Sequence, residues 1–230
     1  TYSELNQQAN RVAQAILRQC TFGEERIALL FEHDAPMIAG ILGVLKVGKT
    51  YIPLDPNYPS DRVVYILENS LASAVLTNNK NLARAQELTR GIIPLINIDD
   101  ISLTGSCDEI KQEISPELIA YILYTSGSTG QPKGVIQNHR NVLHFIRNYT
   151  NNLHINEQDK LTLLSSYSFD AAIMDIFGAI LNGATLYPIN IKEEGLTDLS
   201  QWLQQEKITI YHSTPTLYRH FVSTISGDEK

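Results

Sequence analysis

The sequence predicts an α/β fold, in which largely parallel sheets are layered with flanking helices. Segments rich in Ile, Leu and Val alternate with amphipathic segments of about ten residues along most of the chain. The Ile/Leu/Val segments show little polar alternation, which is typical of strands buried on both faces. Strands that alternate with helices favour parallel pairing, because each crossover helix returns the chain to the same end of the sheet. With 230 residues, of which 43% are hydrophobic and 19% charged, the chain is long enough to bury a core.

The elements expected in the first part of the chain follow from helical spacing, apolar runs and turn residues. Ser3 and Ser60 stand where side-chain caps begin helices, and Gly48 stands where a helix ends. Asp55 and Pro56 end the strand before them. In order, we expect a helix at 5–17, a strand at 27–31, a helix at 36–47, a strand at 50–54, a helix at 60–69, a strand at 73–77, a helix at 80–89 and a strand at 92–98.

A polar stretch at 99–116 is the best candidate for a linker, and the alternation resumes after it. In order, we expect a strand at 119–125, a helix at 140–150, a strand at 161–165, a helix at 171–181, a strand at 185–187, a helix at 198–206, a strand at 208–212 and a helix at 216–224. Open parallel sheets bind ligands beyond the carboxyl ends of their strands. We therefore look for site residues in the loops that follow strands.

Charge and composition exclude several classes of protein. The chain has 25 Asp and Glu against 18 Lys and Arg, and the net charge of −7 disfavours a nucleic-acid partner. Neither Cys20 nor Cys107 has a second Cys or a His at a metal-ligand spacing, so we expect no metal site of this kind. No signal peptide opens the chain and no apolar run approaches the ~20 residues of a membrane span, so we expect a cytoplasmic protein without membrane contact. The chain begins at Thr1 rather than Met, which suggests a piece of a longer protein.

The most informative segment is the loop after the strand that ends at Thr125. Residues 124–135 read Tyr-Thr-Ser-Gly-Ser-Thr-Gly-Gln-Pro-Lys-Gly-Val. Glycines allow the backbone to approach a ligand closely, and hydroxyls, backbone N–H groups and Lys133 are the donors that a polyphosphate needs. The spacing fits neither a Walker A loop nor the Gly-x-Ser-x-Gly turn of serine hydrolases. We interpret the loop as phosphate-binding, with a flexible surface turn as the alternative.

Three other segments carry distinctive patterns. They are 1–5 (Thr-Tyr-Ser-Glu-Leu), 45–62 around Leu-Asp-Pro at 54–56, and 168–171 (Ser-Phe-Asp-Ala). Together with 119–135, these segments resemble, in order and spacing, motifs of the adenylate-forming superfamily, specifically of the adenylation domains of nonribosomal peptide synthetases. The resemblance covers essentially the whole chain. It implies the N-terminal part of the adenylate-forming enzyme fold, made of α/β subdomains with a binding crevice between them.

The resemblance also implies a reaction. It implies an amino-acid-adenylating ligase, which uses ATP to activate an amino acid as an aminoacyl adenylate and releases pyrophosphate. Thioesterification to the phosphopantetheine arm of a peptidyl carrier protein follows, so the implied partners are the amino acid, the carrier protein and neighbouring synthetase domains. The implied cofactors are ATP and Mg²⁺. The loop residues that the resemblance assigns to the β- and γ-phosphates are Thr125, Ser126, Gly127, Ser128, Thr129, Gly130 and Lys133, of which Thr125 and Lys133 are the catalytic candidates. A solvated loop lysine is the alternative for Lys133.

A second set of residues is implied to bind the amino acid. Asp170 is implied to pair with the α-ammonium group, because a buried ammonium needs a carboxylate partner. Its alternative role is to cap the helix at 171–181. The substrate pocket is implied to take Phe169, Ala171, Met174 and His212, although a lone Met is more often core and a lone His more often structural.

The chain departs from the family pattern in its last part. Between His212 and Lys230 we find neither the Glu motif that helps to hold magnesium, nor the ribose-binding Asp, the hinge or the Lys of the small C-terminal domain. We therefore interpret 1–230 as an incomplete N-terminal large part of an adenylation domain and expect these residues alone to be inactive. The alternatives are an acyl- or aryl-CoA ligase of the same superfamily, which Asp170 and the Leu-Asp-Pro segment disfavour, and a non-catalytic nucleotide-binding module.

Overall fold

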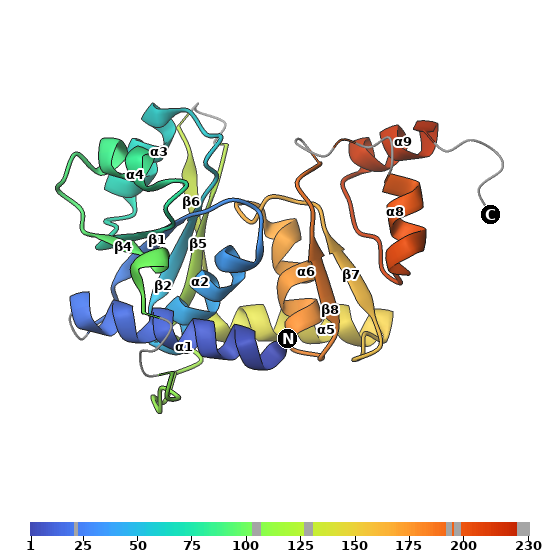
Figure 1. The fold of residues 1–230 in the computed structure, drawn as a ribbon, viewed down its shortest axis with the longest axis horizontal. Helices are drawn as coiled ribbons and strands as arrows, with labels where there is room; N and C mark the ends of the chain where they lie inside the picture. Colours follow the sequence, from blue (N-terminus) through green and yellow to red (C-terminus); the bar gives the residue numbers. More distant parts are fainter. Residues whose placement is uncertain (21–22, 103–106, 127–130, 192–194, 196–198, 225–230) are drawn as a thin grey trace. The chain divides into compact units, whose positions relative to one another are not determined.

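The fold is mixed α/β, as the sequence predicts (Figure 1). A computed structural model describes residues 1–20, 23–102, 107–126, 131–191, 195 and 199–224. The chain divides into two compact units, Thr1–His144 and Phe145–Lys230, and we describe each by itself. The predicted binding crevice between subdomains would involve both units, and it stays a prediction. In the described part of the chain, no helix is both long enough and apolar enough to span a membrane.

A six-stranded sheet forms the centre of the first unit, with the strand order β4-β3-β1-β2-β5-β6. Its strands are β1 (Arg26–Leu30), β2 (Thr50–Leu54), β3 (Ala74–Thr77), β4 (Leu95–Asn97), β5 (Ile119–Thr125) and β6 (Lys133–Asn138). β5 and β6 pair antiparallel, and the other neighbours pair in parallel. The parallel strands therefore end at one edge of the sheet, where the following loops begin.

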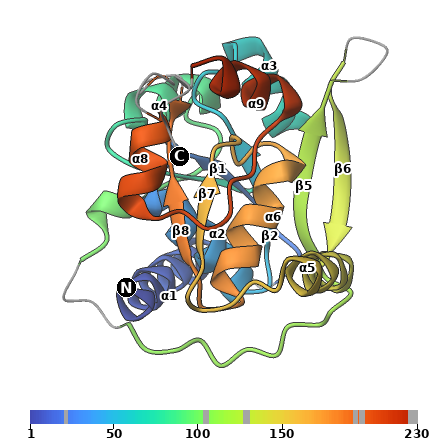
Figure 2. The ribbon, with the colours of Figure 1, turned by 90° about the vertical axis from the view of Figure 1, so that its right-hand side faces the viewer.

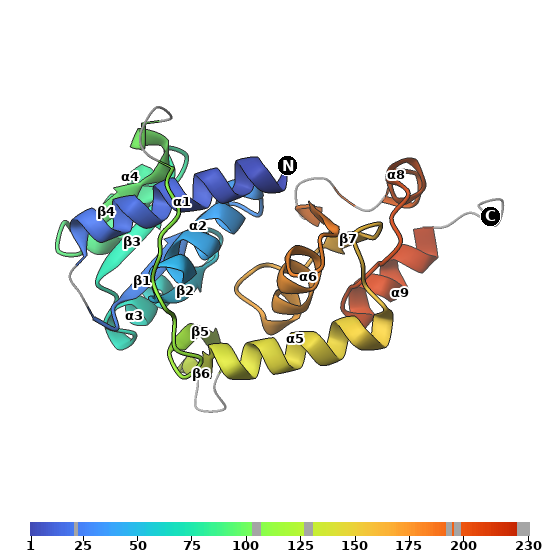
Figure 3. The ribbon, with the colours of Figure 1, turned by 90° about the horizontal axis from the view of Figure 1, so that it is seen from below.

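Two pairs of helices cover the two faces of this sheet. On one face, α1 (Tyr2–Gln19) lies along α2 (Ala35–Lys46), as Figure 3 shows. Gly43 makes this packing possible, because a Cβ atom there would lie 2.5 Å from Cγ1 of Val12. On the other face, α3 (Ser60–Asn69) and α4 (Leu82–Thr89) bury apolar side chains against the strands. A short 3₁₀ helix, η1 (Ile98–Asp100), follows β4.

The second unit is built around a smaller sheet. β7 (Lys160–Leu163) and β8 (Thr185–Pro188) pair in parallel, and α6 (Asp170–Ile180) connects them. The other helices are α8 (Leu199–Glu206), α9 (Pro215–Thr224) and α5 (His139–Leu153), which begins in the first unit. The ring of Trp202, the single tryptophan, lies edge-on to Tyr187 with centroids 5.6 Å apart. Trp202 therefore reports on the packing of this unit.

Two predicted helix caps are wrong. The hydroxyl of Thr1, not Ser3, accepts a hydrogen bond from the backbone N–H of Glu4, and the Glu4 side chain completes a capping box. The extended residue before α3 is Pro59, so Ser60 is already the first helical residue. In both cases the cap lies upstream of the serine.

The predicted strand at 208–212 is also wrong. It forms a single parallel bridge, Ile210 to Leu161. The ladder stops there because the backbone N–H of His212 donates to the hydroxyl of Thr162 (3.2 Å) rather than to a main-chain carbonyl. In contrast, the sequence did not predict β6.

The stretch at 99–116 is not a boundary between the two units. The side-chain amide of Asn10 in α1 donates to the carbonyl of Cys107 (2.9 Å), and Ile114 lies against Gly48, where a Cβ would be 3.1 Å from its Cδ1. This stretch therefore belongs to the first unit, and the boundary falls inside α5. Because α5 continues across this boundary, no change of composition marks the boundary in the sequence.

Candidate functional site

The loop interpreted as phosphate-binding connects the two strands of the β5–β6 hairpin (Figure 2). Thr125 ends β5 and Lys133 begins β6, and the two residues are partners in the antiparallel register. Directly opposite residues of such a pair project on the same face of the sheet, with Cβ atoms about 5 Å apart. Thr125, Ser126 and Lys133 are all exposed. The hairpin thus places Lys133 opposite Thr125, with Ser126 next along the chain, whereas Gly127, Ser128, Thr129 and Gly130 lie outside the described residues.

Close packing and a side-chain hydrogen bond anchor the hairpin next to this loop. A Cβ atom at Gly134 would lie 2.9 Å from Cγ2 of Ile122 and 3.2 Å from Cζ of Tyr124, so only glycine lets β6 pass this close to β5. The hydroxyl of Tyr124 donates to the side-chain carbonyl of Asn69 at the end of α3 (2.7 Å). Lys133 therefore projects from an anchored strand rather than from a loop, which corrects the expected placement.

Asp170 is the first residue of α6, and its side chain is exposed. The N-cap is Phe169, whose backbone is extended and whose side chain is also exposed. The capping interpretation of Asp170 is therefore wrong by one residue. Among the described residues, we find no hydrogen bond or ion pair that uses the Asp170 carboxylate. The positive end of the helix dipole favours a carboxylate at this position, which leaves it placed to accept a cation.

The other predicted pocket residues also meet at α6. Met174 lies one helical turn after Asp170 and on the same face, and both Ala171 and Met174 are half-buried. His212 reaches the same helix from the segment after the Ile210 bridge. Within the second unit, Asp170, Ala171 and Met174 thus share the first turns of α6, and His212 contacts the same helix.

The contact between His212 and α6 is made by Asp175, which the sequence analysis missed. Nδ1 of His212 lies 2.8 Å from Oδ1 of Asp175. The Asp175 side chain is 1% exposed and that of His212 is 26% exposed. Burial raises the pKa of Asp175 to about 6, although the hydrogen bond from His212 opposes the shift. The same hydrogen bond raises the pKa of His212, against the effect of its own burial.

This pair predicts a pH-dependent stability of the second unit. The folded pKa values of Asp175 and His212 both lie above the unfolded values of 3.8 and 6.5, so the folded state binds more protons. Stability from the pair is complete below about pH 4 and is lost as the pH rises through 6 and above. The Asp175 shift alone corresponds to on the order of 3 kcal/mol.

We expect urea unfolding, followed by Trp202 fluorescence, to show wild type losing stability between about pH 5 and pH 8 relative to Asp175→Asn. The comparison with this variant subtracts the titration of all other groups. Equal pH slopes for the two proteins would contradict the coupling.

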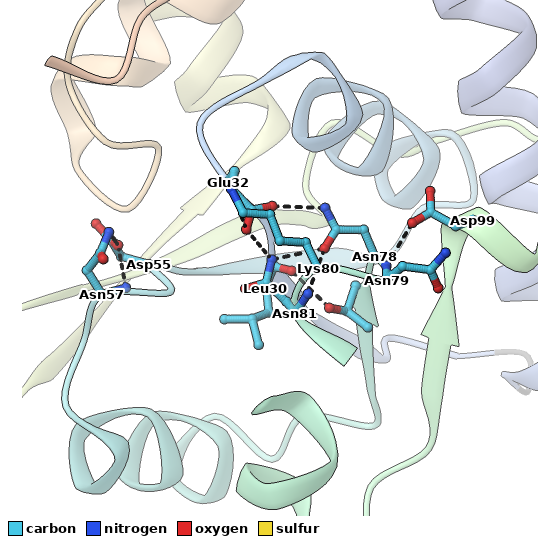
Figure 4. Close-up of polar contacts among 10 residues, drawn as sticks. Leu30, Glu32, Asp55, Asn57, Asn78, Asn79, Lys80, Asn81 and Asp99 are labelled. Carbon is cyan, nitrogen blue, oxygen red and sulfur yellow. Dashed lines mark hydrogen bonds and ion pairs between the residues drawn. The ribbon is translucent and has the colours of Figure 1, made fainter. Parts of the chain in front are cut away.

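A second polar cluster lies at the carboxyl ends of β1, β3 and β4 (Figure 4). The Glu32 carboxylate accepts hydrogen bonds from the side-chain amides of Asn78 and Asn81, both at 2.9 Å. Burial raises the pKa of Glu32, but these hydrogen bonds outweigh it and hold the pKa below its ordinary value. Asp99 accepts from the backbone N–H of Asn79 (2.7 Å). Because these groups satisfy each other, we interpret the cluster as tying the strand ends together rather than as a ligand site.

The hairpin donors fit a polyphosphate, but a magnesium site is not found. Among the residues described, no group of three or more His, Cys, Asp or Glu side chains is placed to hold a metal ion. By the sequence analysis, the magnesium-binding Glu motif lies outside residues 1–230, so the implied Mg²⁺ stays a prediction.

Comparison with known proteins decides the family. Residues 1–230 match the family model of the AMP-binding enzymes. The chain belongs to the AMP-binding enzyme family. This family membership confirms the resemblance to the adenylate-forming superfamily that the four motifs indicate.

Several relatives of this AMP-binding chain are synthases of peptide products. It is 35% identical to surfactin synthase subunit 2 of Bacillus subtilis over 99% of the chain, and 36% identical to gramicidin S synthase 2 of Brevibacillus brevis over 95%. It spans only 6% and 5% of the lengths of these relatives. The nonribosomal peptide synthetase FmoA3, solved bound to α-methyl-L-serine-AMP, superimposes on the whole chain with a TM-score of 0.90 at 27% identity, and the chain covers 26% of it. The adenylation-domain resemblance and the fold class are thus confirmed.

Proposed function

We propose that this chain takes part in the ATP-dependent activation of an amino acid as an aminoacyl adenylate, with release of pyrophosphate. The acyl group then passes to the phosphopantetheine thiol of a peptidyl carrier protein within a larger synthetase. The proposal is supported by the synthetase relatives and by the aminoacyl-AMP ligand in the FmoA3 structure. The observation that carries it is the exposed Asp170 carboxylate at the start of α6, for which we find no hydrogen bond or ion pair to another described residue.

The hairpin donors act on the phosphate groups. In adenylation the substrate carboxylate attacks the α-phosphorus of ATP, the bond from that phosphorus to the bridging oxygen breaks, and pyrophosphate leaves with the electron pair. Two anions must approach each other, so their charge must be neutralised by fixed donors. We assign this role to the hydroxyls of Thr125 and Ser126 and to the ammonium of Lys133, together with the glycine-rich residues between them.

The residues of α6 act on the amino acid. A substrate ammonium that leaves water needs a carboxylate partner, and Asp170 supplies it. Ala171, Met174, His212 and the exposed Phe169 then surround the side chain. The ammonium contact also distinguishes amino acids from the fatty or aryl acids that CoA ligases of the superfamily activate.

The remaining expectations stay proposals. We propose that residues 1–230 are part of a larger adenylation domain, whose other residues hold Mg²⁺, and that these residues alone do not catalyse adenylation. Neighbouring synthetase domains and a cytoplasmic location are also expected from the sequence.

Amino-acid-dependent ATP–pyrophosphate exchange in the full-length protein tests the proposed function. We expect exchange with at least one of the twenty amino acids, none with its analogue that lacks the α-amino group, and transfer of the activated amino acid to a carrier protein. Because the amino acid and this analogue differ only in the α-amino group, the comparison measures the contribution of the ammonium contact. Exchange with fatty or aryl acids, followed by transfer to free CoA, would instead support the CoA ligase alternative.

A further inference from the structure

The Asp175–His212 pair joins a buried carboxylate to a partly exposed ring. Asp175 projects from the middle of α6 and is 1% exposed, whereas the ring of His212 is 26% exposed. The contact uses Nδ1 of the ring and Oδ1 of the carboxylate, at 2.8 Å. Nε2 of His212 has no hydrogen-bond partner among the described residues. The ring therefore has one nitrogen committed to α6 and the other available to a ligand.

The burial of Asp175 favours a pair without net charge. Its Oδ2 atom is buried and has no hydrogen-bond partner among the residues that the structure describes, so a lone carboxylate here would be poorly stabilised. The uncharged pair holds two protons, one shared between Oδ1 and Nδ1 and one on Nε2. Whichever of Oδ1 and Nδ1 carries the shared proton, Nε2 carries the other and is a donor.

The neighbours of the pair do not compete for this role. Burial, with a smaller effect of the Asp175 charge, raises the pKa of Tyr149 in α5 to about 12, so its hydroxyl stays protonated. The backbone of His212 is held by the hydrogen bond to Thr162. The ring is thus fixed at both its backbone and its Nδ1 atom.

We propose that Asp175 is a positioning residue that holds His212 as a hydrogen-bond donor in the amino acid pocket, and that the pocket selects a side chain ending in a carboxyl or carboxamide oxygen. Such an oxygen accepts from Nε2–H, and a carboxylate also attracts the shared proton onto the ring, which forms an imidazolium. The half-buried Met174 supplies an apolar wall for the methylene groups of such a side chain. This inference rests on the proposed function, because it names the class of amino acid for the same pocket.

The test is the exchange assay in the full-length protein with Asp, Asn, Glu, Gln, Leu, Met and Lys as substrates. We expect the preferred substrate to come from the first four and to exceed Leu and Met at least about 100-fold in kcat/KM, because a site built to hydrogen-bond rejects an analogue without the acceptor.

Asp175→Asn should raise KM for that amino acid at least about 10-fold and leave KM for ATP unchanged. The amide oxygen of Asn can accept from Nδ1–H of a neutral ring, which turns Nε2 into an acceptor.

Two controls separate positioning from folding. Glu157→Gln changes an exposed carboxylate of the same unit and should leave both KM values at the wild-type level. His212→Leu should cause the same loss as Asp175→Asn, and the double variant should lose no more, because the two residues act as one group. Far-ultraviolet circular dichroism checks that each variant is folded.

The outcomes distinguish the selectivity inferred for the pocket from the proposed function on which it rests. Preference for an aliphatic or cationic side chain, or an Asp175→Asn variant with an unchanged KM, would overturn the inference and leave the proposed function standing. Exchange with no amino acid would overturn the proposed function and the inference with it.

Discussion

Replacement of Asp170 by alanine is expected to lower kcat/KM for the amino acid by about 10²- to 10³-fold in the full-length protein. Removing one partner of a desolvated ion pair costs about 3–5 kcal/mol, because the remaining charge keeps its desolvation cost without compensation. Here the remaining charge is the substrate ammonium. Amino-acid-dependent pyrophosphate exchange measures the loss, and we expect it in KM for the amino acid as well as in kcat.

The structure also predicts what Asp170→Ala leaves unchanged. Asp170 is exposed and caps no helix, so the free energy of unfolding should change by no more than about 0.5 kcal/mol, measured by Trp202 fluorescence. The matched variant Asp170→Asn keeps the shape of the side chain and removes its charge, and we expect a comparable loss of exchange. Retention of amino-acid activation in either variant would show that Asp170 does not pair with the ammonium.

The sequence allowed the loop to be found but not the strand that follows it. The run at 119–125 is apolar and β-branched enough to predict β5 within its observed bounds. β6 was missed because Pro132 and Gly134 interrupt the pattern and because polar residues stand at both ends of the strand. Tertiary packing overrides these local signals, since Gly134 is the residue that lets β6 lie against Tyr124. Only the pairing shows that Lys133 lies opposite Thr125.

A similar limit applies to the amino acid pocket. The four motifs place Asp170 at the start of α6, and the structure confirms the helix and shifts its start by one residue. Asp175 carried one signal that was available from the sequence, which is a carboxylate in the middle of an otherwise apolar segment. Its partner, His212, is 37 residues away along the chain, and no periodicity connects the two. Long-range pairs of this kind follow from the fold alone.

The second large effect is expected at Lys133. We predict that Lys133→Ala lowers kcat/KM for ATP by about 10- to 100-fold, because a hydrogen bond to a charged phosphate contributes about 1.5–3 kcal/mol. Lys133 lies opposite Thr125, next to the loop that we interpret as phosphate-binding. Exchange rates at varied ATP concentration measure the loss, and Lys133→Arg should recover part of it because it restores the charge without the point geometry of an ammonium.

A matched control decides between this role and that of a solvated lysine. Lys111 is also exposed and belongs to the same unit, but it lies in the stretch before β5. If only the overall charge of the protein mattered, Lys111→Ala and Lys133→Ala would weaken ATP use equally, and added salt would remove both effects. If Lys133 contacts the phosphates, Lys111→Ala leaves KM for ATP at the wild-type value and the Lys133→Ala loss persists in salt. Because the net charge of the chain is −7, ATP binding requires positive charge concentrated at the site. The difference between the Lys111→Ala and Lys133→Ala variants, rather than the net charge, therefore identifies the residue that supplies it.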